Sequence, residues 1–134
     1  MIVRLLTAAA VLVSGAVHLK LWFDGFRYED VVGPAFMVNA VAGLVIAVLL
    51  LWWRHWVPLF LAVGFGASTL GAFVLATTAG LFGLHEHWEG IYVWAAAVSE
   101  ALAIILGLVA GVQEGWLSRD GLQQARAVRS PHLR

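Results

Sequence analysis

Long apolar stretches alternate with short polar interruptions along the whole of this chain. Four stretches are each long enough to cross the hydrocarbon layer of a membrane as a helix, which takes about 20 residues. They cover residues 2–23, 31–53, 57–84 and 91–112. The polar interruptions, 24–30, 54–56 and 85–90, are too short to form domains of their own. The pattern predicts an all-α fold, a bundle of four transmembrane helices over residues 1–112.

Composition strengthens this prediction. Hydrophobic residues make up 62% of the chain and the mean hydropathy is +0.89, values too apolar for an ordinary soluble domain. The 8 basic and 8 acidic residues cancel, so no net field recruits nucleic acid. The absence of cysteine excludes disulfides, thiol redox chemistry and iron–sulfur ligation. We expect a multi-pass protein of the plasma (inner) membrane, surrounded by lipid.

The placement of the basic residues predicts an orientation. Arg4, Arg54 and the arginines of the polar, basic tail 113–134 fall on one side of the predicted membrane, whereas only Lys20 and Arg27 fall on the other. The positive-inside rule therefore predicts that both termini lie in the cytoplasm. The first span also has features of a signal peptide, but three further spans follow it, so we expect it to be retained.

Small residues recur at every fourth position of each predicted span, on one helix face. Helices in lipid associate largely through close packing of such residues. The stripes include Ala10 and Ser14 in the first span, Gly43 and Ala47 in the second, Gly64 and Ser68 in the third, and Ala103 and Gly107 in the fourth. These faces are expected to form the helix interfaces.

Polar side chains inside the predicted membrane are candidates for a ligand-binding site, because ionisable groups there are costly. Glu100 lies roughly 13 Å into the fourth span at about 1.5 Å per residue. His18, Asn39, Thr77 and Thr78 fall in the same, outer half of the membrane. Two interpretations stay open for His18 and Glu100: a structural hydrogen bond that fixes the bundle, or part of a functional pocket.

The third interruption offers candidate metal ligands in His85, Glu86, His87 and Glu89. Two histidines separated by one residue do not share a helix face, so they would bind one ion only from an irregular loop. Ordinary residues of the membrane interface are the alternative interpretation. A haem held by His18 together with His85 or His87 is a further hypothesis, since b-type ligation needs imidazoles from facing elements. The sequence names no cofactor beyond these haem and divalent-metal hypotheses.

Two resemblances accompany these residues. The motifs Arg4-Leu5-Leu6 and Gly15-Ala16-Val17-His18-Leu19 resemble the opening helix of the DoxX-like superfamily of small four-helix membrane proteins. A larger set is similar to small four-helix membrane proteins common in actinobacteria, over about residues 14–105. This set comprises His18-Leu19-x-Leu21-Trp22-x-x-Gly25-Phe26-Arg27, Val32-Gly33-Pro34-x-Phe36-x-x-Asn39, Gly80-Leu81-Phe82-Gly83-Leu84-His85-Glu86 and Ser99-Glu100. The first resemblance implies a link to quinone or respiratory redox systems, and the second implies no activity.

Three functional hypotheses follow, and no complete catalytic constellation favours an enzyme. The first is a non-catalytic accessory or assembly subunit of a membrane complex, for which a respiratory or redox complex is one candidate. Its partners would be other membrane subunits or a second copy of the chain. The second is a redox or ligand-binding module whose outward-facing pocket takes haem, a metal or a quinone. The third is a proton-coupled carrier that uses Glu100, although the broken helices typical of transporters are not visible.

Overall fold

A computed structural model describes residues 2–80 and 89–116, and all regular structure in these residues is helical. The long helices are α1 (Ile2–Phe23), α2 (Val32–Trp52), α3 (Trp56–Thr78) and α4 (Ile91–Gln113), and the 3-10 helix η1 (Phe26–Tyr28) lies between α1 and α2. Each of the 4 long helices is long and apolar enough to cross a membrane. The predicted all-α class and the four candidate spans are confirmed.

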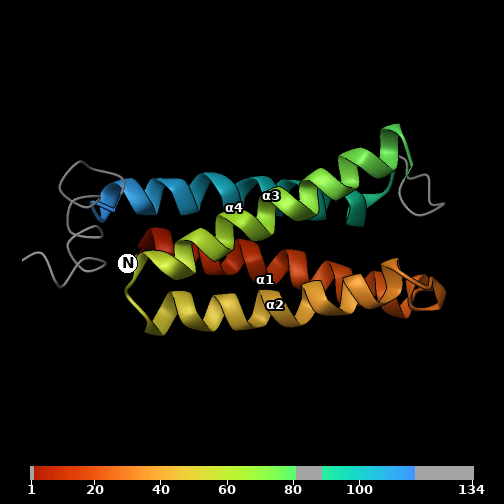
Figure 1. Ribbon diagram of the computed structural model, residues 1–134, viewed down its shortest axis with the longest axis horizontal. Helices are drawn as coiled ribbons and strands as arrows, with labels where there is room; N and C mark the ends of the chain where they lie inside the picture. Colours follow the sequence, from red (N-terminus) through yellow and green to blue (C-terminus); the bar gives the residue numbers. More distant parts are fainter. Residues whose placement is uncertain (1, 81–88, 117–134) are drawn as a thin grey trace, which may run out of the picture.

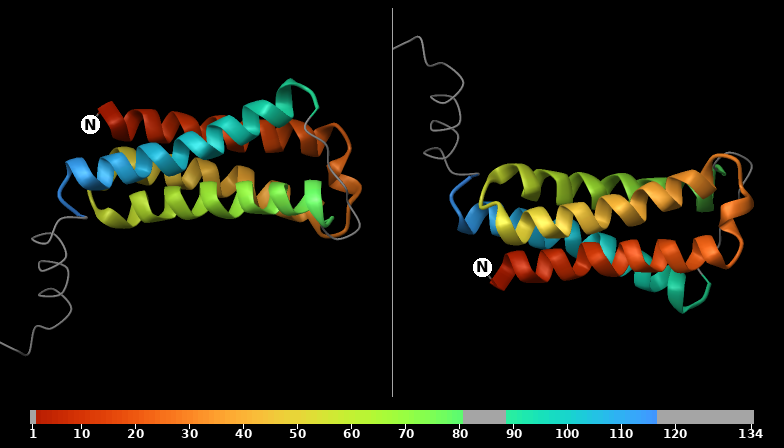
Figure 2. Two further views of the ribbon diagram at one scale, coloured as in Figure 1. Left: turned by 90° about the horizontal axis from the view of Figure 1, so that it is seen from above. Right: turned by 90° about the horizontal axis from the view of Figure 1, so that it is seen from below.

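The helices form a bundle in which α1 lies between α2 and α4 (Figures 1 and 2). Helix α1 packs extensively along α2 and α4, and α3 packs along α4, whereas α2 and α3 contact each other only sparsely. The start of α1, the α2–α3 connection and the end of α4 lie together at one end of the bundle, here called the Arg4 end. From there α3 runs obliquely away from α2 (Figure 1). The opposite end, here called the η1 end, contains η1.

Helix α3 is shorter than the sequence pattern predicts. It begins at Trp56, where the His55 side chain caps it by accepting a hydrogen bond from the Val57 N–H at 3.3 Å. The expected continuation to residue 84 is wrong, because the helix ends at Thr78. Gly80 adopts a φ of 85°, and its N–H donates to the Leu75 carbonyl at 3.0 Å, which closes the helix in a left-handed turn.

Small residues bring α1 and α2 into close contact, as predicted. A Cβ atom added to Gly15 would lie 3.4 Å from the Ala40 carbonyl oxygen, and one added to Gly43 would lie 3.2 Å from the Val11 carbonyl oxygen. A Cβ at Gly15 would just fill the space, whereas one at Gly43 would be tighter than ordinary contact and would press on the α1 backbone. The predicted stripes of α1, α2 and α4 are buried at Ala10, Ser14, Gly43, Ala47, Ala103 and Gly107.

The stripe predicted for α3 is buried only in part, because Ala76 is buried and the first members of the stripe are not. Gly64 and Ser68 are exposed, and Gly66 instead faces α4, where an added Cβ would lie only 2.6 Å from the Glu100 carbonyl oxygen. Helix α3 is apolar on every side and carries small residues on more than one face. The spacing of its small residues therefore could not identify the face that packs on α4.

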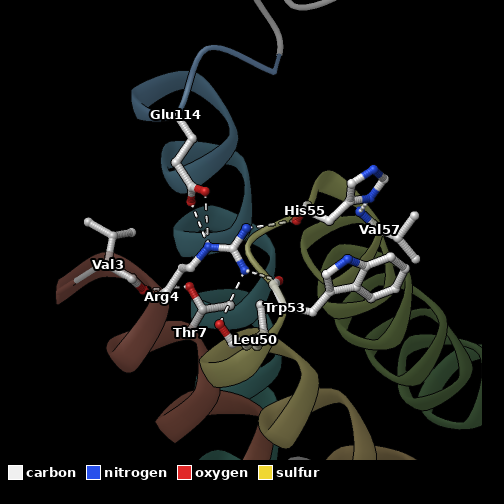
Figure 3. A network of polar contacts seen from close by, with 8 residues as sticks. All are labelled: Val3, Arg4, Thr7, Leu50, Trp53, His55, Val57 and Glu114. Atoms are coloured by element: carbon white, nitrogen blue, oxygen red, sulfur yellow. Dashed lines mark hydrogen bonds and ion pairs between the residues drawn. The ribbon is translucent and has the colours of Figure 1, made fainter. Parts of the chain in front are cut away.

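Arg4 connects three segments of the chain at the Arg4 end (Figure 3). Its side chain is 1% exposed. The Nε atom donates to both carboxylate oxygens of Glu114, at 2.8 and 3.0 Å. Nη1 donates to the carbonyls of Leu50 at 3.2 Å and Trp53 at 3.1 Å, and Nη2 donates to the His55 carbonyl at 2.7 Å. One guanidinium thus joins α1 to the end of α2, the α2–α3 connection and the end of α4.

The carbonyl partners of Arg4 explain why a cation is stable in an apolar bundle. The last carbonyls of a helix have no N–H partner within the helix, and they form the negative end of its dipole. Leu50 and Trp53 lie at this end of α2. The positive charge is therefore neutralised by Glu114 and by a helix terminus together, and all three guanidinium nitrogens donate hydrogen bonds.

We expect Arg4→Met to destabilise the folded protein by about 3 kcal/mol, because it removes the donor from the Leu50 and His55 carbonyls and from the Glu114 carboxylate. Glu114→Gln serves as the matched control and should cost about 1 kcal/mol or less, since Glu114 is 28% exposed and the carbonyl bonds of Arg4 remain. Denaturant unfolding in mixed micelles, followed by circular dichroism, measures both. Equal losses for the two variants would contradict the structural role assigned to the carbonyl bonds.

Candidate functional site

A cavity of about 350 Å³ lies between α2 and α3, in the half of the bundle nearer the η1 end. It occupies the region where the two helices contact each other only sparsely. Its wall is largely apolar and includes four phenylalanine rings, from Phe26, Phe36, Phe65 and Phe73. Exposed residues at its rim, among them Val38, show that the cavity reaches the outer surface of the bundle. The volume falls within the range of small-molecule sites, about 300–1,000 Å³.

The polar part of the wall is contributed by His18, Asn39, Ser68 and Thr69. Asn39 donates from Nδ2 to the Thr69 hydroxyl oxygen at 2.9 Å, which joins α2 to α3 across the cavity. Thr69 in turn donates to the carbonyl of Phe65, one helical turn earlier, at 2.6 Å. The Asn39 Oδ1 atom is buried and has no hydrogen-bond partner in the described part of the chain. Leaving such an acceptor unpaired costs about 1–3 kcal/mol.

His18 belongs both to the cavity wall and to a second polar group. This group consists of Ser14, His18 and Glu100. Glu100 is 2% exposed, and its Oε1 atom accepts a hydrogen bond from the Ser14 hydroxyl at 3.3 Å. The His18 Nε2 atom lies 3.7 Å from the same oxygen, and its Nδ1 atom lies 2.7 Å from the Ser14 carbonyl oxygen. The edge of the His18 ring also contacts the Phe36 ring, with the centroids 4.8 Å apart.

These contacts determine where the protons of the pair can reside. A carbonyl oxygen only accepts, so the His18 Nδ1 atom must carry hydrogen. The His18 Nε2 and Glu100 Oε1 atoms are 3.7 Å apart, longer than a hydrogen bond, and one further proton on either of them would make the pair neutral. With that proton the pair is either a neutral imidazole with a carboxylic acid or an imidazolium with a carboxylate, and both states have zero net charge. Either state avoids leaving an unpaired charge in a buried, apolar environment.

The structure therefore brings some predicted site residues together and separates others. His18 and Asn39 line the same cavity, and Glu100 contacts His18 from behind the wall without lining it. Thr77 and Thr78 do not line the cavity, and their hydroxyls donate back to the Val74 carbonyl at 2.9 and 2.8 Å.

Most of the predicted metal ligands lie in a part of the chain that the structure does not describe. His85, Glu86 and His87 lie outside the described residues, so their prediction stays a prediction. Glu89 is described and exposed. Among residues 2–80 and 89–116, no group of three or more His, Asp and Glu side chains is arranged to hold a metal ion. His18 is also poorly placed to ligate haem iron within the cavity, because its two ring nitrogens face the Ser14 carbonyl and Glu100.

Sequence reasoning missed the aromatic wall and the role of Thr69. Phe65 and Phe73 are eight residues apart and therefore share a helix face, a signal that the spacing contained. Thr69 resembles any hydroxyl that bonds back to its own helix. Its second bond, to Asn39, depends on the relative placement of α2 and α3, which no local pattern specifies.

Comparison with known proteins adds no assignment. No protein-family model, no curated protein and no solved structure matches this chain. The site is therefore interpreted from its own geometry.

Replacing Glu100 tests the neutral pair. We expect Glu100→Gln to lower the free energy of unfolding by about 1 kcal/mol or less, because the amide can still accept from Ser14 and donate to His18. Glu100→Leu should cost about 1–3 kcal/mol, since it leaves the polar groups of Ser14 and His18 without that partner. Unfolding in mixed micelles measures the difference. A Gln variant as unstable as the Leu variant would show that a fixed ionic pair, rather than a neutral one, holds these helices.

Proposed function

We propose that this chain is a small integral membrane protein that binds an apolar, ring-bearing molecule in the cavity between α2 and α3. The observation that carries the proposal is a cavity of about 350 Å³, walled by phenylalanine rings and bordered by His18 and Asn39. Apolar pockets with few, well-placed polar groups are the usual form of small-molecule sites. A quinone head group is one molecule of this class. The proposal corresponds to a binding module rather than to an enzyme.

The surroundings of the cavity suggest how such a ligand would enter. The rim is formed by exposed residues of α2 and α3, including Ala35, Val38 and Ser68. In a helix bundle that crosses a bilayer, side chains on this surface face lipid. We therefore propose that the ligand is dissolved in the membrane and enters sideways between α2 and α3.

We further propose that the membrane is the plasma (inner) membrane and that both termini lie in the cytoplasm. The support is the distribution of basic residues: Arg4 and Arg54 belong to the Arg4 end of the bundle, whereas Lys20 and Arg27 belong to the η1 end. Positive charge is retained on the cytoplasmic side. The cavity would then lie in the outer half of the bilayer.

Filling the cavity tests the binding function. Calorimetric titration of the micellar protein with naphthalene, using empty micelles as the blank, should show saturable binding to the wild-type chain. We expect Ala72→Phe to weaken this binding at least about tenfold, because the new ring occupies volume that the ligand needs. Ala72 lines the cavity.

Ala67→Phe provides the matched control, since Ala67 is an exposed residue of the same helix and does not line the cavity. It should leave the affinity unchanged. Absence of saturable binding to the wild-type protein, or equal effects of the two substitutions, would refute the binding function at this site.

A second candidate function is an accessory or assembly subunit, and the exposed face of α3 favours it. Gly64, Ala67 and Gly71 lie on this face, and a Cβ added to Gly64 or Gly71 would meet nothing within 4 Å. Small residues at this spacing allow a further transmembrane helix to approach closely. The partner would be another membrane subunit or a second copy of the chain.

Native mass spectrometry in mild detergent tests this second candidate. We expect a complex heavier than the 14.5 kDa chain, which Gly71→Leu disrupts because the larger side chain blocks close approach. Val74→Leu is the control, because Val74 is already a large exposed side chain of the same helix. A wild-type protein found only as a single chain would exclude this assembly.

A further inference from the structure

The hydrogen bonds around Asn39 fix the direction in which its carboxamide points. Thr69 has one hydroxyl hydrogen, and the Phe65 carbonyl oxygen 2.6 Å away can only accept it. The Thr69 oxygen therefore has only lone pairs left for Asn39. An amide nitrogen, and not an amide oxygen, must face it at 2.9 Å. The assignment of nitrogen and oxygen in Asn39 thus follows from the network itself.

This direction leaves an acceptor over at the cavity wall. The Asn39 Oδ1 atom is buried and has no hydrogen-bond partner among the described residues. The other polar groups of the wall already have partners: Ser68 donates to the Phe65 carbonyl at 3.2 Å, and His18 Nδ1 lies 2.7 Å from the Ser14 carbonyl. Oδ1 is therefore the buried side-chain atom of the described wall that has no partner at all, and a ligand that donates a hydrogen bond would satisfy it.

We propose that the cavity selects aromatic alcohols, ring-bearing molecules whose hydroxyl hydrogen is donated to Asn39 Oδ1, over the same rings without a donor. This inference rests on the proposed binding function and specifies its ligand class. The rings of Phe36, Phe65 and Phe73 form the wall against which a flat ring packs. Neighbouring atoms cover Oδ1, so binding entails a small rotation about the last torsion of Asn39, which is a soft one.

Three naphthalene derivatives test the inference on the full-length chain in micelles. Calorimetric titration compares 2-naphthol, which donates, with 2-methoxynaphthalene, which only accepts, and with naphthalene, which does neither. Each affinity is corrected for partition into empty micelles. We expect 2-naphthol to bind the wild-type protein about five- to tenfold more tightly than either of the other two, the effect of one additional satisfied hydrogen bond.

Substitutions of the network locate the source of the preference. Asn39→Leu should bind all three compounds with similar affinity, because the acceptor is gone. Thr69→Val frees the amide to turn its nitrogen toward the ligand, so 2-methoxynaphthalene should gain relative to 2-naphthol. Thr78→Val is the matched control and should keep the wild-type preference, because the Thr78 hydroxyl also donates to a carbonyl of its own helix but does not line the cavity. Far-ultraviolet circular dichroism checks that each variant is folded, and Thr69→Val provides the test if Asn39→Leu is not.

The outcomes separate this inference from the function on which it rests. If naphthalene binds saturably and 2-naphthol binds no more tightly, the binding function stands and the selection of aromatic alcohols is overturned. A preference for 2-naphthol that survives in Asn39→Leu overturns it as well. If none of the three compounds binds the wild-type protein, the proposed binding function itself fails.

Discussion

The guanidinium of Arg4 is the interaction on which the arrangement of the bundle depends. In an apolar environment a buried cation persists only where the protein supplies charge and hydrogen-bond acceptors around it. Here Glu114 of the α4 terminus and the carbonyls of Leu50, Trp53 and His55 supply them. The end of α2, the α2–α3 connection and the end of α4 are thereby held around the first turns of α1.

The cavity exists because the Arg4 contacts hold α2 and α3 together at one end only. Helices α2 and α3 are held together at the Arg4 end, and α3 then follows α4 rather than α2 (Figure 1). The close approach of Gly66 to the Glu100 carbonyl keeps α3 against α4. Space is therefore left between α2 and α3 toward the η1 end, bridged by the bond from Asn39 to Thr69.

The two polar groups beside the cavity differ in how many of their polar atoms have a partner. Ser14, His18 and Glu100 form a closed group that can hold one further proton without net charge. Such a group stabilises helix packing, and a ligand is not needed to pair its polar atoms. Asn39 is different, because its oxygen is left without a donor at the cavity wall. A buried polar atom that borders a cavity and lacks a partner is the more informative sign of binding.

The sequence predicted the parts of this structure that periodicity and depth control. The four apolar stretches predicted the four helices. The positions of His18 and Glu100 along their spans predicted a similar depth for both side chains, and in the structure the two are in contact. Arg4 was seen only as an orientation signal. Its main partners are backbone carbonyls, which every residue possesses and which therefore leave no trace in a sequence.

The interface of α3 and the partner of Asn39 could not be predicted for a related reason. Gly64 and Gly66 are equally small, and only the packing of α3 against α4 decides which of them is buried. The bond from Asn39 to Thr69 likewise depends on how far apart α2 and α3 lie. Local patterns describe each helix well and the spaces between helices poorly.

The central claim is that a ligand occupies the space between α2 and α3 beside Asn39. A crystal structure of the protein grown in a lipidic mesophase, after isolation from its own membrane without added ligand, tests it most directly. The account predicts discrete, flat electron density against Phe36 and Phe65, with a polar atom within hydrogen-bond distance of Asn39. Helices α2 and α3 packed together without a cavity, or density only of lipid chains continuous with the bilayer, would contradict it.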